Sequence, residues 1–443
     1  MTPVATPLRE QFLAALREGD ADRVRSLLDS DDEVRALINA PIGAFGQRPA
    51  AIARDHLPVI DVLLAHGADL NLKSDWWAGP FGLLESNMTP ERAAPLIARG
   101  AIVDIFAAAH LGMFDRVKEL VEADPSQVRA RGGDGRTALH CAKTVEIAEY
   151  LLAKGADIDA RDVDHESTPA QYLVREAPEV ARMLVERGAW FDLFIAVALN
   201  DPALVERSLR ADPEALDHRI WHGKYTTVHR NGRASTREEI GAHRGDIYRW
   251  VFDHNASALD VAAKVASPEV YAILWRHATP AQRLLAACAR GDRQTATDVI
   301  AEHPDVVSSL TLDQRKLIVD RAHANDAAAV LLMVDLGFDS LVKGVDDWEA
   351  IRWGAFHGNV EMVARLLQHS PPINVPDPSY GGTILAQCLY GSLHGWHCRD
   401  GQFAATAKLL LDAGEMPKPD WHSIGRDDVD AVLKAWFDAH PRA

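Results

Sequence analysis

The amino-acid sequence predicts an all-α solenoid, in which short helix pairs repeat along 443 residues. The first observation is a leucine-rich segment that ends in glycine and recurs at a fixed spacing. Gly67 and Gly100 are 33 residues apart, and so are Gly155 and Gly188. A glycine in the left-handed conformation commonly ends a helix, and the leucines before it would face the interior. A period of 33 residues therefore indicates stacked helix–turn–helix units.

A second recurring segment ends its helix in a different way. Its copies are LVEADPSQV (120–128), SLRADPEAL (208–216) and VIAEHPDVV (299–307). A proline shortly after the last helical residue prevents the helix from continuing. No stretch rich in Gly, Ser or Pro separates these copies. We therefore expect one continuous array of helix pairs rather than separate domains.

Both ends of such an array need caps, because an open repeat exposes its apolar interior. Residues 8–28 are expected to form the N-terminal cap. Near the other end, five apolar residues follow the spacing of one helix face: Val429, Val432, Leu433, Trp436 and Phe437. This spacing predicts an amphipathic closing helix.

Composition and charge exclude several classes of protein. Hydrophobic residues make up 47% of the chain, which is typical of a packed protein. The net charge of -17 disfavours binding to nucleic acid, because the phosphate backbone would be repelled. The longest uncharged apolar run, Ala327 to Val334, is far shorter than the roughly 20 residues of a membrane span, and the first residues lack the apolar core of a signal peptide. The four scattered cysteines favour reduced thiols. We expect a cytoplasmic protein without nucleic-acid or membrane partners.

The first helix of each unit also recurs, as TALHCA (137–142), STPAQY (167–172), SALDVAA (257–263) and EAIRWGAFHGN (349–359). Residues 137–159, with Thr-x-Leu-His, the leucine pair and Gly-Ala-Asp, resemble the ankyrin repeat. The resemblance implies an ankyrin-repeat solenoid of about twelve units, with a concave face built from loops and first helices. Units one to six would occupy residues 1–192, and units seven to twelve with the closing helix residues 193–443.

A long insertion interrupts the repeats at residues 217–254, where a short loop would suffice. It contains RIWHGKYTTVHRNG (219–232), which is basic and aromatic. The alternation in KYTTVH suggests a strand, Asn-Gly in RNGR (230–233) a tight turn, and STREEI (235–240) a capped helix. We expect this segment, the flap, to be ordered and to cover the groove of units eight to twelve. The alternative is an insertion that only covers a weak stretch of the solenoid.

The ankyrin resemblance implies that residues just before the end of each first helix face the groove. Transferred to the last five units, this pattern places one polar side chain in each unit: Lys264, Arg290, His323, His357 and Tyr390. Each of these side chains can carry or donate a proton. We expect them to lie along one groove.

Aromatic turns and a second insertion are predicted to wall a ligand pocket over this groove. Trp348 and Tyr380 precede first helices, and residues 388–403 add His394 and Trp396. The flap would contribute Trp221, His222, Lys224, Tyr225 and His254. His394, His397 and Cys398 form an incomplete zinc set, so we expect no metal and no cofactor.

Three functions are compatible with these features. The first is a binding module that recognises a protein partner or ligand in the concave groove of the C-terminal half. The second is an enzyme or sensor for a small anionic or polar molecule under the flap, with His323, His357 or Tyr390 in acid–base roles and Lys264 or Arg290 holding an anionic group. The third is an assembly role for the flap. The sequence contains no recognised catalytic motif.

Overall fold

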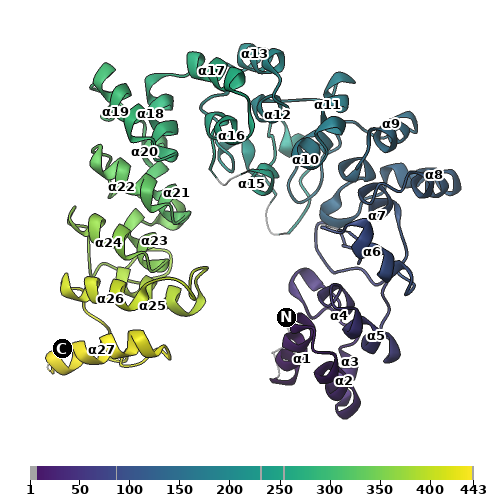
Figure 1. The fold of residues 1–443 in the computed structure, drawn as a ribbon, viewed down its shortest axis with the longest axis horizontal. Helices are drawn as coiled ribbons and strands as arrows, with labels where there is room; N and C mark the ends of the chain where they lie inside the picture. Colours follow the sequence, from purple (N-terminus) through teal and green to yellow (C-terminus); the bar gives the residue numbers. More distant parts are fainter. Residues whose placement is uncertain (1–6, 86, 230–231, 253–254, 442–443) are drawn as a thin grey trace. The chain divides into compact units, whose positions relative to one another are not determined.

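The computed structural model describes residues 7–85, 87–229, 232–252 and 255–441. Its contacts divide the chain into two compact units, Met1–Val270 and Tyr271–Ala443. The predicted all-α class is confirmed, because the described ranges form α- and 3-10 helices and no strand (Figure 1). One isolated β-bridge joins Arg219 and Ser257. The division of the repeats at residue 192, which was made by counting repeats, is a different division and stays a prediction.

The first unit consists of short helices joined by turns. Its α-helices are α1 (Pro7–Glu18), α2 (Ala21–Ser30), α3 (Asp32–Ala36), α4 (Pro49–Ile52), α5 (Leu57–Ala65), α6 (Pro90–Ile97), α7 (Ile105–His110), α8 (Phe114–Ala123), α9 (Val145–Ala153), α10 (Pro169–Glu176), α11 (Pro178–Glu186), α12 (Leu193–Ala198), α13 (Pro202–Ala211), α14 (Arg237–Ile240), α15 (Tyr248–Val251) and α16 (Ala258–Val265). Its 3-10 helices are η1 (Ala44–Gly46), η2 (Pro125–Arg129), η3 (Gly133–Gly135), η4 (Ala138–Cys141) and η5 (Gly223–Tyr225). Helix α17 (Pro268–His277) contains the boundary between the units.

The second unit continues the pattern of helix pairs. Its helices are α18 (Pro280–Ala289), α19 (Arg293–Glu302), α20 (Leu312–Arg315), α21 (Leu317–His323), α22 (Ala327–Asp335), η6 (Val345–Asp347), α23 (Ala350–Phe356), α24 (Val360–Leu367), α25 (Ile384–His394), α26 (Phe403–Asp412) and α27 (Asp427–Ala439). In the described ranges of both units, no helix is long and apolar enough to cross a lipid bilayer.

Both predicted kinds of helix ending are present. Gly67, Gly100, Gly155 and Gly188 adopt φ values between 90° and 100°, so each occupies the left-handed region that a side chain disfavours. In the second kind, α8 ends at Ala123 and a proline follows within two residues. The repeat period in the sequence therefore corresponds to real helix ends.

First helices begin with a recurring capping box, in which a Ser or Thr hydroxyl and a side chain three residues later satisfy the free amides of the first turn. The pairs are Thr137/His140, Thr168/Gln171, Ser257/Asp260, Thr279/Gln282 and Thr311/Gln314. His140 also joins neighbouring repeats, because its Nε2 lies 3.1 Å from the backbone oxygen of Ser167. The Thr-x-Leu-His motif thus starts a helix and holds the next loop in place.

The apolar core of the second unit is continuous from α18 to α27. Helix α23 packs against α21, α24 and α25, so each helix pair buries its inner face on the next pair. Helix α27 closes the array through Val429 and Leu433, which are buried, while Val432 and Trp436 pack against the core from its edge. The predicted closing helix is therefore confirmed.

Candidate functional site

A cavity of about 680 Å³ lies in the second unit, between the turns that precede α23 and α25 and the loop that follows α25. Seven aromatic residues line it: Trp348, Trp353, Phe356, Tyr380, Tyr390, Trp396 and Trp421. His394 also lines it, together with Asp346 and Lys418, one charge of each sign. Predominantly apolar cavities with few polar groups are the common form of a binding site.

The aromatic residues divide into a buried wall and an exposed rim. Trp348 and Trp353 are buried, and their rings lie 4.7 Å apart. Tyr380, Tyr390 and Trp396 are 68%, 58% and 64% exposed. A cluster of exposed aromatic side chains at the mouth of a cavity is typical of an interaction site.

The second insertion places Trp396 at this rim. After α25 ends at His394, the chain turns back so that the Trp396 ring lies nearly parallel to Trp353, with centroids 6.1 Å apart. The same ring contacts His323 edge-on at 5.1 Å. The insertion therefore adds an aromatic side chain over helix α23 instead of extending away from it.

His357 does not lie along the groove as the sequence predicted. It is 1% exposed, and its Nε2 lies 2.9 Å from the backbone oxygen of His323, so its ring joins the ends of α23 and α21. Burial lowers the pKa of His357 to about 4 and also lowers the pKa of His323. The expectation that His357 faces the groove with little burial is wrong, because its ring packs beneath Trp396 and against Trp353.

The other members of the expected line are distributed differently. Tyr390 lines the cavity, with its ring against Phe356 and His394. Arg290 ends helix α18, where its Nη1 donates a hydrogen bond to the Tyr271 hydroxyl at 2.5 Å. Lys264 is exposed on α16 in the first unit and lines a smaller hollow of about 170 Å³. The described lining of the aromatic cavity therefore contains Tyr390 from this set but not Arg290 or Lys264.

The histidine and cysteine residues of the second insertion each contact a different residue. The His394 ring packs on Tyr390, and His397 Nδ1 lies 3.3 Å from a carboxylate oxygen of Asp400. Cys398 is half-buried, and its backbone oxygen accepts a hydrogen bond from Arg426 at 2.5 Å. The absence of a metal at His394, His397 and Cys398 stays a prediction.

The flap is anchored to its own unit through the loop before α10 and the start of α12. The carboxylate of Glu166 accepts hydrogen bonds from the backbone amides of Val228 (2.9 Å) and His229 (3.0 Å). The hydroxyls of Tyr225 and Tyr248 each donate to Asp192 at 2.9 Å. These anchors hold the flap on the first unit, and its expected position over the groove of units eight to twelve stays a prediction.

Local structure in the flap agrees with the sequence only in part. The predicted capped helix is confirmed as α14, with Thr236 and Glu239 forming the box. The predicted strand is wrong, because residues 223–225 form a 3-10 turn and 226–229 have no regular structure. The expected turn at 230–231 and the candidate His254 lie outside the described residues.

The flap residues expected to bind a ligand are also separated. Lys224 and Tyr225 line a second cavity, beside α12 and α13. Trp221 is half-buried, with the Arg249 guanidinium 5.2 Å from the centre of its ring, and His222 is exposed. Among the described lining residues of that cavity, neither Trp221 nor His222 is present.

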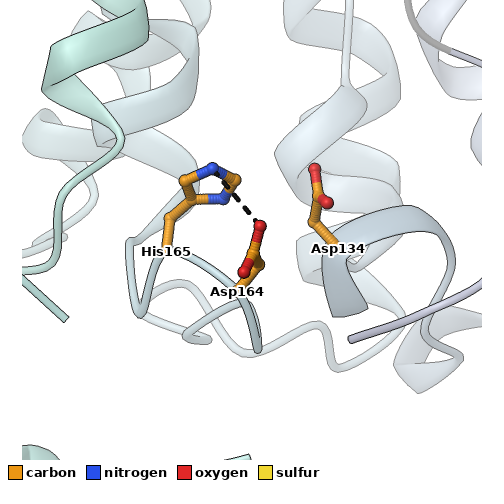
Figure 2. Close-up of side chains that lie close together, drawn as sticks. All are labelled: Asp134, Asp164 and His165. Carbon is orange, nitrogen blue, oxygen red and sulfur yellow. Dashed lines mark ion pairs between the residues drawn. The ribbon is translucent and has the colours of Figure 1, made fainter. Parts of the chain in front are cut away.

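An acidic cluster around His165 was missed by the sequence reasoning. Figure 2 shows Asp134 and Asp164 beside His165, and ligand atoms of all three lie within 4.8 Å of one another, close enough to share a metal ion. His165 Nε2 lies 3.7 Å from Asp164 Oδ2, and its Nδ1 lies 3.1 Å from Asp162 Oδ2. A carboxylate behind a histidine is the arrangement that orients metal-binding imidazoles.

A proton on His165 can also balance the negative charge of this cluster, without a metal ion. Burial alone lowers the pKa of His165, but the hydrogen bond with Asp162 and the charges of Asp162, Asp134 and Asp164 outweigh it and raise the pKa to about 9. A protonated ring therefore offsets part of the carboxylate charge. The only signal in the sequence was the run DVDHE (162–166) inside a loop between repeats.

Comparisons with known proteins agree with this architecture. Residues 105–195 match the family described as ankyrin repeats (3 copies). The mouse ankyrin repeat and SAM domain-containing protein 6 is 32% identical over 114 residues, which are 22% of this chain and 13% of that protein. The human palmitoyltransferase ZDHHC13 is 34% identical over 102 residues, covering 22% and 16%.

A third relative is the alpha-latrocrustotoxin-Lt1a of Latrodectus tredecimguttatus, 28% identical over 155 residues, which are 30% of this chain and 10% of the toxin. The chain therefore matches less than a fifth of the length of each of these relatives. The helix endings and capping boxes extend the same unit beyond the matched residues. The chain therefore contains ankyrin repeats, which the family model matches at residues 105–195.

Proposed function

We propose that the chain is a protein-interaction module, and that the aromatic cavity in the second unit receives an apolar side chain of its partner. The observation that supports this most directly is the exposed rim of Tyr380, Tyr390 and Trp396 above a buried aromatic wall. Tryptophan and tyrosine are enriched among the few residues that supply most of the binding energy at protein interfaces.

The charges of the cavity favour an apolar anchor over an ionic one. Asp346 and Lys418 are of opposite sign, so the lining has no excess charge to attract an anion or a cation. The Lys418 ammonium lies 5.4 Å from the centre of the Trp421 ring and is thereby held at the edge of the cavity. A leucine, phenylalanine or tryptophan side chain would bury the rim aromatics and remove their apolar surface from water.

The proposal assigns no reaction to His323 or His357. His357 is buried behind Trp353 and Trp396, and burial keeps its ring neutral at physiological pH. A general acid or base must reach the reacting atoms, which a ring in this position does not do. The small-molecule alternative is therefore better supported by the second cavity, in the first unit.

The experiment is a selection from a phage-displayed random peptide library on the full chain, followed by fluorescence polarisation with the selected peptide. We expect enriched peptides to share an apolar or aromatic anchor. Trp396→Ala should weaken binding at least tenfold, which is the effect of removing a central aromatic contact. Trp250→Ala is the matched control, because Trp250 is a 68% exposed tryptophan in the flap.

Two outcomes would contradict the proposal. Enriched peptides without an apolar anchor would exclude recognition by the aromatic rim. Equal affinities of the wild-type chain and the Trp396→Ala variant would place binding on another surface.

A further inference from the structure

A second cavity, of about 550 Å³, lies in the first unit where the flap meets α12 and α13. The repeat contributes Arg207 and Ser208 from α13, and the flap contributes Lys224, Tyr225 and Arg244. Three of these five side chains are basic. Two carboxylates, Asp192 and Asp212, also line the cavity, so its formal charge is +1 with His218 neutral, whereas the whole chain carries -17.

The two guanidinium groups in the cavity are held over aromatic rings and keep their hydrogen-bond donors free. Arg207 lies 4.7 Å from the centre of the Phe191 ring, and Arg244 lies 4.7 Å from the centre of the Trp190 ring. Within the described residues, neither guanidinium has an ion pair or a hydrogen bond. Each arginine can therefore present a fork of donors to an anion without breaking an existing contact.

The carboxylates that line the cavity already have partners. Asp192 accepts the hydroxyls of Tyr225 and Tyr248 and the backbone amide of Ile195, each at 2.9 Å. Asp212 lies 3.2 Å from the ammonium of Lys224, and 3.7 Å from Nδ1 of His218, whose pKa is lowered by burial. Within the described residues, the guanidinium groups of Arg207 and Arg244 form no ion pair at contact distance, although the charge of Arg244 still acts on Asp192.

Ser208 is an independent sign of a ligand. It is 6% exposed, lines the cavity, and its Oγ has no hydrogen-bond partner in the part of the chain that the structure describes. A buried hydroxyl without a partner is costly, because it has lost its water.

We propose that this cavity binds the phosphate group of a small molecule. Two guanidinium forks and one hydroxyl supply donors for the oxygens of a phosphate monoester, beside the Lys224 ammonium that is paired with Asp212. The cavity is larger than a phosphate ion, so the rest of the molecule would lie along the rings of Trp190 and Tyr225. This inference is independent of the proposed function, because the aromatic cavity lies in the other unit.

Isothermal titration calorimetry on the full chain, in 150 mM NaCl, tests the site. The probes are inorganic phosphate, ribose 5-phosphate and unphosphorylated ribose. We expect saturable binding of ribose 5-phosphate, weaker binding of phosphate, and no binding of ribose. Arg207→Gln and Arg244→Gln should each weaken binding at least tenfold, and Ser208→Ala severalfold.

The matched control is Arg210→Gln, because Arg210 is an arginine of the same helix with a 69% exposed side chain outside the described lining. Arg244 belongs to the flap, so its substitution can also loosen the flap. The melting temperature and the hydrogen exchange of the flap are therefore measured for each variant. If Arg244→Gln loosens the flap, the binding result of Arg207→Gln decides the test. Equal losses in Arg207→Gln and Arg210→Gln, or no heat up to millimolar sugar phosphate, would overturn the proposal.

A third outcome separates the possible sources of the phosphate group. Tighter binding of a phosphoserine peptide than of ribose 5-phosphate would refute the small-molecule assignment. The variant Trp396→Ala should bind ribose 5-phosphate as the wild-type chain does. A negative result for phosphate binding therefore does not refute the proposed role of the aromatic cavity. A negative result for the aromatic cavity likewise does not refute phosphate binding.

Discussion

At the scale of single residues, His165 is a buried cation among three aspartates. Its pKa of about 9 exceeds the ordinary value of 6.5, so protonation of the ring stabilises the folded chain. The sign follows from linkage: this contribution is complete below pH 6.5 and is lost as the pH rises through 9. The loss should reach up to about 3 kcal/mol.

Urea denaturation of the wild-type chain and His165→Gln between pH 6 and pH 9.5 measures this contribution. The free-energy difference between the two proteins should be largest near pH 6 and should shrink as the pH rises. A difference that does not change with pH would show that His165 is neutral in the folded chain.

His357 makes the opposite prediction, because burial lowers its pKa to about 4. The unfolded chain then binds more protons than the folded chain between pH 6.5 and 4, so His357 should destabilise the fold as the pH falls through that range. His357→Ala should cost about 1–3 kcal/mol at pH 7, because the backbone oxygen of His323 loses its partner.

The control for His357 is Tyr390→Ala. Tyr390 is 58% exposed, so its truncation should change the free energy of unfolding by about 0.5 kcal/mol or less. Both variants are measured by urea denaturation at pH 7. Equal small effects would mean that the contact between α21 and α23 through His357 contributes nothing.

At the scale of elements, the flap is held by a carboxylate that accepts two backbone amides. Glu166→Gln removes the charge from this acceptor, and hydrogen bonds to charged groups contribute about 1.5–3 kcal/mol. The amides of residues 226–229 should then exchange with solvent faster, as measured by hydrogen-exchange mass spectrometry. Glu176→Gln is the control, since Glu176 is exposed on α10. Unchanged exchange in the flap would contradict the anchoring role.

The flap also shows where sequence reasoning reached its limit. The capping box of α14 could be predicted, because its two side chains and the helix they start lie within six residues. The docking position could not, because it depends on Asp192 and Glu166, which are distant in sequence and lie in turns without an unusual pattern. Contacts between residues close in sequence can be predicted from the sequence, whereas contacts between distant residues cannot.

At the scale of the whole molecule, the repeat period predicted the fold class and both helix endings, since stacked repeats are periodic and mostly local. The same periodicity misplaced His357, because Trp396 of the second insertion, which is not part of the repeat pattern, packs over its ring. Arg207 and Ser208 were missed for another reason: both lie on an ordinary repeat helix, and only the docked flap turns that helix face into a cavity.

The division of contacts into two units predicts two steps in unfolding. Leu385→Ala truncates a fully buried residue of α25 and should cost about 2–5 kcal/mol. Hydrogen-exchange mass spectrometry should show faster exchange in residues 271–441 and unchanged exchange in residues 7–229. Acceleration of equal size in both ranges would show that the chain unfolds in a single step.

The anchoring of the flap to residues 164–192 has a consequence for synthesis on the ribosome. These anchors precede the flap in the chain, so they have been translated before Tyr225 and Tyr248 appear. Proteins fold from the N-terminus as they emerge, at roughly 5–20 residues per second. The flap can therefore dock on finished repeats while residues 271–443 are still being made, and its aromatic side chains spend little time exposed in the nascent chain.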